Sequence, residues 1–253
     1  MSTTKKLTSS GAVSAVPSGN AILTTDANGA IKPVTIAALQ NAVMNNVPPA
    51  CMLDGVFIMY HRKSDNLSLM LKPHKWASLQ NAGEIADGVV IVEGGKVLVV
   101  APTEADSAGL LWSSAAVSGG AATHIDRLTA MTDWNGKANT DEIISKSTST
   151  AVTDTDAYAP GFCNLYSHGG LGAGKWWLPS VSEMMMVYAN ITKINYCLRL
   201  INGATQLSES GYWTSTEYSA SYAWRLHLGD GYLHWYPKTV TKGRVRPVSA
   251  FIE

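Results

Sequence analysis

Apolar residues run in short blocks, or alternate with polar ones, along most of the chain after Met52. The segments "GVFIMYHR" (55–62) and "LSLMLK" (67–72) flank the polar "KSDN" and predict a β-hairpin. The run "GVVIVEGGKVLVVA" (88–101) predicts a second hairpin that turns at Glu93-Gly94-Gly95. Because its apolar residues are consecutive, we expect both faces of this second hairpin to be buried.

The clearest helix start lies in "LPSVSEMMMVYANI" (178–191). Ser180 can cap the first turn and Glu183 can reach back to it, which is the capping-box pattern. The run Met184-Met185-Met186 is typical of flexible core filler, and a soft ligand-binding surface is the alternative. A second helix is predicted from Lys193 to about Leu200. Short helices are expected around 125–131 and 140–146, within an otherwise irregular polar stretch.

Residues 1–50 differ from the rest of the chain, because they lack aromatic residues and are rich in Ser, Thr, Ala, Gly and Asn. The pattern predicts strands at Ala21–Thr24 and from Ile31, joined by a turn at 26–29. A short helix is expected next, with Thr35 as a possible N-cap, and Val47-Pro48-Pro49 then forms a stiff linker. So little apolar surface cannot hold a fold alone, so we expect this segment to depend on partners.

The segment "AWRLHLGDGYLHWYPK" (223–238) predicts a β-hairpin whose two faces differ in character. A two-residue turn at Gly229-Asp230, with Gly229 supplying a positive φ, pairs each residue with one across the hairpin. The predicted pairs are Leu228 with Gly231, His227 with Tyr232, Leu226 with Leu233, Arg225 with His234, Trp224 with Trp235 and Ala223 with Tyr236. The pairing puts the leucines and tryptophans on one face and Arg, His and Tyr on the other.

The aromatic density of this region is unusual, since residues 212–236 hold eight of the 21 aromatic residues (8 Trp, 10 Tyr and 3 Phe). An outward face of Tyr, His and Arg is typical of binding hot spots. Two alternatives stay open. Another part of the chain can cover this face, or a one-residue slip can turn the tryptophans outward, at the cost of burying Arg and His.

The composition of the chain limits which classes of partner it can bind. Lys plus Arg and Asp plus Glu number 19 each, so the net charge is zero, which argues against nucleic acid and against a membrane surface. Charged residues make up only 15% of the chain, which favours self-association. No apolar run reaches the roughly 20 residues of a membrane span, and no signal-peptide core follows Lys5-Lys6, so we expect synthesis in the cytoplasm.

Candidate catalytic and metal chemistry is sparse. The three cysteines, Cys51, Cys163 and Cys197, lack metal-ligand spacing and are expected to be buried free thiols. His227 and His234 can approach each other, yet Asp230 is the only acidic residue near them, so no metal is expected. "GGLGAG" (169–174) lacks the ending of a phosphate loop and favours a plain turn. No nucleophile elbow is present.

Three ordered motifs carry a family resemblance: "WWLPSVSE" (176–183), "YWTSTE" (212–217) and "RVRPV" (244–248). Together with "DWNGKANTDEII" (133–144), they make residues 85–251 resemble a bacterial and phage family with the C-type lectin fold. The resemblance implies an α+β class, with two helices and a mainly antiparallel sheet in a domain spanning 51–253. That fold is shared with formylglycine-generating enzymes, but their catalytic cysteine arrangement is not evident, so we expect no enzyme.

Within this family the chain resembles the variable proteins of diversity-generating retroelements, in which chosen codons near the end of the gene are rewritten. The resemblance implies a variable-like region at 212–247. Its fixed positions are Tyr212, Trp213, Ser215, Glu217, Trp224, Gly231, Lys238, Arg244, Arg246 and Pro247. The positions that resemble the variable, ligand-binding set are Ser219, Ala220, Ser221, Tyr222, Arg225, His227, Asp230, Tyr232, His234, Trp235, Tyr236, Thr239 and Thr241. Trp235 conflicts with the pairing above, which buries it.

The phrase "GNAILTTDANGAIKPVTIAAL" (19–39) resembles attachment segments of phage tail fibres. The two resemblances together imply a receptor-binding protein at a phage tail tip, or at a bacterial cell surface, that grips a bacterial surface protein or glycan. Residues 1–50 would attach and oligomerise the chain, with a trimer favoured. No cofactor is expected, and binding is predicted to be independent of calcium, because no cluster of carboxylates and amides is evident. A structural fibre or pilus subunit is the alternative, and a formylglycine-type enzyme is a distant third.

Overall fold

The protein is described from a computed structural model, which places residues 21–25, 31–35, 54–116, 118–121 and 123–250. The chain divides into two units, Met1–Val47 and Pro48–Glu253. In the first unit, β1 (Ala21–Thr25) and β2 (Ile31–Thr35) pair antiparallel, as the sequence predicts. The helix predicted after Thr35 and the residue Cys51 lie outside the described residues.

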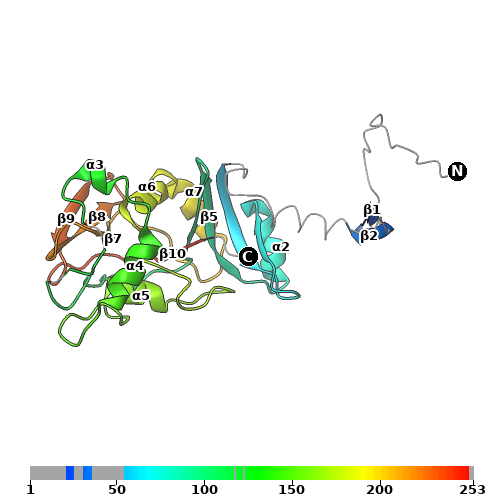
Figure 1. Cartoon of the computed structure of the whole chain (residues 1–253). Helices are drawn as coiled ribbons and strands as arrows, with labels where there is room; N and C mark the ends of the chain where they lie inside the picture. The colour runs from blue at the N-terminus through cyan, green and yellow to red at the C-terminus, as the bar shows by residue number, and fades with distance from the viewer. Residues whose placement is uncertain (1–20, 26–30, 36–53, 117, 122, 251–253) are drawn as a thin grey trace. The chain divides into compact units, whose positions relative to one another are not determined.

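The second unit is of the α+β class and holds two antiparallel sheets (Figure 1). Five strands form the larger sheet in the order β10-β6-β5-β3-β4, and three form the smaller one in the order β7-β8-β9. The strand bounds are β3 (Gly55–His61), β4 (Ser68–Leu71), β5 (Ala86–Glu93), β6 (Lys96–Val100), β7 (Gly211–Glu217), β8 (Tyr222–His227), β9 (Leu233–Pro237) and β10 (Val248–Ser249).

Strand β5 shows why the larger sheet is buried on both faces. Side chains alternate along a strand, so Val89 and Ile91 enter one apolar cluster while Val90 and Val92 enter another on the opposite face. All four are at most 1% exposed. The two hairpins predicted from the apolar blocks, β3–β4 and β5–β6, are therefore confirmed, as is burial of both faces.

Six α-helices occur among the described residues, so the expected number of two is wrong. They are α2 (Trp76–Asn81), α3 (Arg127–Ala130), α4 (Gly136–Ser145), α5 (Ala159–Leu165), α6 (Val181–Ala189) and α7 (Ile191–Leu198), with a 3₁₀ turn, η2 (Pro73–Lys75), before α2. Sequence patterns miss α2 and α5 because each has fewer than two full turns of apolar periodicity. The other four lie where helices are predicted, within a few residues.

Helices α6 and α7 connect the two sheets, since α6 packs on β5, β7 and β8 while α7 packs on β3 and β5 (Figure 1). Met184 and Met186 are 0% and 6% exposed, which confirms the core role predicted for the methionine run. The free thiols of Cys163 and Cys197 are buried, also as predicted. The main apolar cluster is therefore continuous from the larger sheet, through these helices, to one face of the smaller sheet.

The start of α6 is fixed by the predicted capping box. Ser180 accepts a hydrogen bond from the Glu183 backbone N–H, and the Glu183 carboxylate accepts one from the Ser180 backbone N–H at 2.8 Å. Trp177 Nε1 donates a second bond to the same carboxylate oxygen at 3.1 Å. Burial nevertheless raises the pKa of Glu183 to about 7, because the charged form loses its water.

This raised pKa predicts a pH-dependent stability. The folded state holds the Glu183 proton more tightly than the unfolded chain, so its contribution is full below the unfolded pKa and is lost as the pH rises through about 7. Between about pH 5 and pH 8 we expect a loss of up to about 3 kcal/mol in the free energy of unfolding. Urea denaturation across this range measures it. Glu183→Gln should flatten the curve, and an unchanged slope would contradict the assignment.

Candidate ligand-binding face

The β8–β9 hairpin has the register that the sequence predicts. Trp224 lies opposite Trp235 and Leu226 opposite Leu233, and Ala223 and Arg225 take their predicted partners as well. Trp224 and Leu226 are 2% and 0% exposed and belong to the main apolar cluster. The Trp224 Nε1–H also donates to the His124 carbonyl at 2.8 Å. One face of the hairpin is therefore part of the core.

The turn differs from the prediction. Its loop has four residues, Leu228–Gly231, with the Gly231 N–H bonded to the His227 carbonyl at 2.9 Å. Gly231, rather than Gly229, has the positive φ, at 74°. The Leu228 N–H bonds to the Ser210 carbonyl instead of pairing with Gly231. The longer loop keeps the register, because His227 still pairs with Tyr232 across its base.

Aromatic and guanidinium groups follow one another along the opposite face of the hairpin, from α3 past Tyr232 to β9 and β8. The Tyr232 and His234 rings stack with centroids 5.6 Å apart, and His234 meets Tyr236 edge-on at 5.5 Å. The Arg225 guanidinium lies 5.0 Å from the centroid of the Tyr236 ring, and that of Arg127 lies 5.5 Å from the centroid of the Tyr232 ring. We call these five residues the outer row. Stacking and cation–π contacts hold their side chains in place before any ligand arrives.

Exposure along the outer row is uneven. Tyr232 is 48% exposed, and the nearby side chain of His227 is 41% exposed. Arg225 and Tyr236 are half-buried, so this end of the predicted outward face is partly covered. The reason is a third apolar cluster, distinct from the two on the faces of β5, which contains Trp213 and against which Tyr236 packs. Burial accordingly lowers the pKa of Arg225.

Trp235 lies on the core side of the hairpin but is only partly buried. Tyr218 stacks on it at 4.9 Å, Tyr222 meets it edge-on at 4.8 Å, and His234 stacks at 4.8 Å. These contacts explain why the strand pairing predicts a buried Trp235 while the family resemblance predicts a variable surface position. Trp235 borders the core cluster and still reaches the surface at the open edge of the sheet.

The remaining predicted residues lie in the two loops that flank the hairpin and at its tip. Asp230, at the tip, accepts hydrogen bonds from the Tyr232 N–H and from His227 Nδ1, each at 2.9 Å. These bonds, the backbone one first, lower the pKa of Asp230. Ala220 is exposed, whereas the other four are half-buried: Ser219, Ser221, Thr239 and Thr241.

Sequence reasoning missed Arg127 and His124, which lie about a hundred residues before the hairpin. Residues 123–127 reach it because the Thr123–Glu217 bridge and the His124–Trp224 hydrogen bond fasten this segment to the smaller sheet. No local sequence pattern predicts that residues 123–127 contact the hairpin. Only the packing of α3 beside β9 brings Arg127 onto the Tyr232 ring.

The positions that resemble the fixed set form a buried frame. Pro247 is buried, and Gly231 and Arg244 are half-buried. The other seven are at most 2% exposed: Tyr212, Trp213, Ser215, Glu217, Trp224, Lys238 and Arg246. In contrast, every position that resembles the variable set is half-buried or exposed. Within residues 212–247, the positions that resemble the fixed set are thus mostly buried, and those that resemble the variable set are at least partly exposed.

Two ionic contacts hold this frame together. The Lys238 ammonium pairs with the Glu217 carboxylate, and both side chains are fully buried. Lys238 Nζ also donates to the Ala220 carbonyl at 3.1 Å, and the Gly119 N–H donates to Glu217 Oε1 at 3.0 Å. This pair joins the end of β7 to the end of β9.

The second contact centres on Glu104. Its carboxylate pairs with both Arg244 and Arg246, the latter at 3.1 Å, and accepts a hydrogen bond from the Tyr212 hydroxyl at 2.8 Å. Arg246 is 0% exposed and also donates to the Ala101 carbonyl at 3.0 Å. The loop after β6 is thereby tied to β7 and to the segment before β10.

A chain of hydrogen bonds on the larger sheet has the order found in serine hydrolases, Ser68–His61–Asp87. Ser68 Oγ lies 3.3 Å from His61 Nε2, and His61 Nδ1 lies 2.7 Å from Asp87. Ser68 is only 3% exposed, however, and the Gly170 N–H bonds to Asp87 so that its loop closes over the His61 ring. This arrangement holds the loop that contains Gly170 in place, and it leaves the Ser68 hydroxyl too buried to attack a substrate.

Among the described residues, no three His, Cys, Asp or Glu side chains gather in a way that could hold a metal ion. None of the described helices combines the length and apolar character needed to cross a bilayer.

No protein-family model and no curated protein sequence matches the chain.

The Lys238–Glu217 pair predicts a large and asymmetric effect of mutation. Lys238→Met should lower the free energy of unfolding by about 3–5 kcal/mol, because it leaves a buried carboxylate without its cation. Adding Glu217→Gln should recover much of this loss, since no uncompensated charge remains. Chemical denaturation of both variants measures the difference. Lys137→Met serves as control, because this lysine pairs with Asp141 at the surface, and it should change stability by at most about 1 kcal/mol. Equal losses in the single and double variants would contradict this account.

Proposed function

We propose that this chain is a non-catalytic binding protein with a C-type lectin fold, and that the hairpin face of residues 219–241 grips a molecule on a bacterial surface. The observation that carries the proposal is the division of residues 212–247 by burial. The positions resembling the fixed set are packed inside, with Gly231 and Arg244 half-buried, and those resembling the variable set reach the surface. Because the buried residues hold the fold, substitutions at the outward positions of this face should have little effect on stability.

The chemistry of the outer row supports recognition of a protein or glycan surface. Tyr and Arg give large contact area, and their rings and guanidinium groups lose little freedom on binding because they already stack on one another. Zero net charge agrees with such a partner and not with nucleic acid.

The setting we propose is the tail of a phage or prophage, with a bacterial cell surface as the alternative. In this proposal residues 1–50 attach the chain and assemble it as a homo-oligomer, of which a trimer is the favoured form. The support is the tail-fibre resemblance of residues 19–39.

The adhesion experiment uses two aromatic side chains of the face that reach the solvent, His227 and Tyr232. In the double variant His227→Ser/Tyr232→Ser we expect binding of the fluorescent full-length chain to bacterial cells to fall at least about tenfold. Its stability should change by no more than about 1 kcal/mol, because both side chains are surface groups. Tyr196→Ser is the matched control, since Tyr196 on α7 is 47% exposed against 48% for Tyr232.

Three results would count against adhesion through this face. They are unchanged binding in the double variant, equal loss in the Tyr196 control, and a large loss of stability. A structural fibre or pilus subunit is the second candidate, favoured by the exposure of Ile125 (73%) and Leu128 (78%) beside Arg127. That function predicts a smaller particle mass for the double variant, whereas adhesion predicts an unchanged mass.

Diversification has a separate test in the DNA beside the gene. We expect a near-repeat of the codons for residues 212–247, differing mainly at adenines, next to a reverse-transcriptase gene. Sequencing the locus checks it. Absence of the repeat would remove the diversification proposal and leave adhesion to be judged by the cell-binding experiment.

A further inference from the structure

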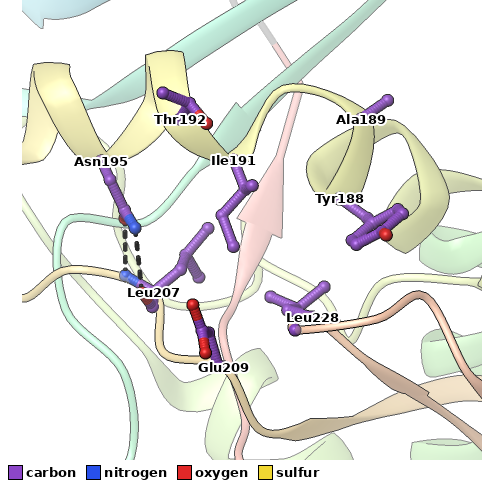
Figure 2. Close-up of a pocket in the computed structure, with 9 residues that line it drawn as sticks. Tyr188, Ala189, Ile191, Thr192, Asn195, Leu207, Glu209 and Leu228 are labelled. Carbon is purple, nitrogen blue, oxygen red and sulfur yellow. Dashed lines mark hydrogen bonds between the residues drawn. The ribbon is translucent and has the colours of Figure 1, made fainter.

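A cleft of about 540 Å³ lies beside the tip of the β8–β9 hairpin, and no residue of the outer row lines it (Figure 2). Its walls are the end of α6, the first turns of α7, the segment 207–209 and the tip residues Leu228 and Gly229. Apart from these two tip residues, the lining lies outside the variable-like region, and neither of the two belongs to the variable-like set.

The floor of the cleft is apolar. Leu207 and Leu228 are 4% and 2% exposed, and Ile191 is half-buried beside them. Figure 2 shows these three side chains converging from three different segments. An aliphatic group placed against Ile191 and these two leucines would lose water on the side that faces them.

The walls are held rigidly. Asn195 donates to the Leu207 carbonyl at 2.9 Å and accepts from the Leu207 N–H at 2.8 Å, so its amide is occupied on both sides (Figure 2). The Leu228 N–H bonds to the Ser210 carbonyl at 2.9 Å, which ties the hairpin tip to the same segment. A ligand therefore meets a site that is already formed.

Glu209 is the one charged residue among those lining the cleft. It is exposed at the rim, and within the described part of the chain no hydrogen bond or ion pair engages its carboxylate. Its Cβ lies 3.1 Å from where a side chain on Gly229 would begin, so the absence of a side chain there keeps the rim open. The site thus combines an aliphatic floor with an unpaired negative charge.

We propose that this cleft holds an arginine or lysine side chain of a protein partner. A methylene stem with a cationic end matches an apolar floor beside a carboxylate, and Arg adds a planar fork for bidentate pairing. The inference rests on the proposed binding function and narrows its partner to a protein surface. Because the lining lies outside the variable-like set, every version of the face would keep this contact.

The test uses small probes on the full-length chain with labelled leucine methyl groups. Titration with N-acetyl-arginine amide should shift the NMR methyl signals of Leu207 and Leu228 saturably and leave those of Leu98, on the larger sheet, unchanged. N-acetyl-citrulline amide, its neutral isostere, should bind more weakly, by up to about fivefold, the largest ratio expected for an exposed ion pair.

Two variants make the test specific. Glu209→Gln should reduce arginine binding to the level of citrulline. Glu142→Gln, on the exposed face of α4, should leave it unchanged. Equal affinity for both probes, no saturable shift at Leu207 and Leu228, or tighter binding of glucosamine, a cationic sugar, would each overturn the proposal.

The outcome is separable from that of the proposed function. Loss of adhesion in the His227/Tyr232 variant together with no arginine binding would overturn the cleft alone. Arginine binding together with unchanged adhesion in that variant would overturn the hairpin face alone.

Discussion

Anchoring of the β8–β9 hairpin through its tryptophan face is the constraint on which the candidate binding face depends. Trp224 and Leu226 are sealed into the main cluster, and the Trp224 indole N–H is bonded to the His124 carbonyl. Because side chains alternate along a strand, burying Trp224 and Leu226 places Arg225 and His227 on the opposite face of the hairpin. The surface chemistry of Tyr232 and His227 follows from burial on the opposite face.

The buried ions make this arrangement tolerant of change at the surface. Glu217 with Lys238, and Glu104 with two arginines, link the strand ends to distant loops without using any residue of the outer row. Such pairs are expensive to break one partner at a time, so they specify the geometry of the frame. The side chains that face outward add little to that geometry, which separates the stability of the fold from what the surface can recognise.

Recognition would then have two components with different origins. The outer row supplies aromatic and cationic groups from β8, β9 and α3. The cleft supplies an apolar floor and a carboxylate from α7 and the segment before β7. At the hairpin tip, Gly229 lies between His227 of the hairpin face and Glu209 of the cleft.

The sequence by itself determined the strands of the apolar blocks, the capping box of α6 and the register of the β8–β9 hairpin. These features depend on neighbours in the chain or on a two-residue period, which the sequence displays directly. It did not determine the four-residue turn, since Gly229 and Gly231 both offer a positive φ and only the contacts of the tip select Gly231.

Tertiary structure alone decided which outward residues are open. Arg225 and Tyr236 share a face with Tyr232, yet Trp213 and its cluster cover one end of that face. Arg127, Glu104 and the floor of the cleft likewise reach their places through contacts between residues about twenty to a hundred and forty apart in the chain. Hydrophobic periodicity and secondary-structure propensity depend on a segment and its neighbours in sequence. Burial depends instead on which distant parts of the chain pack against that segment.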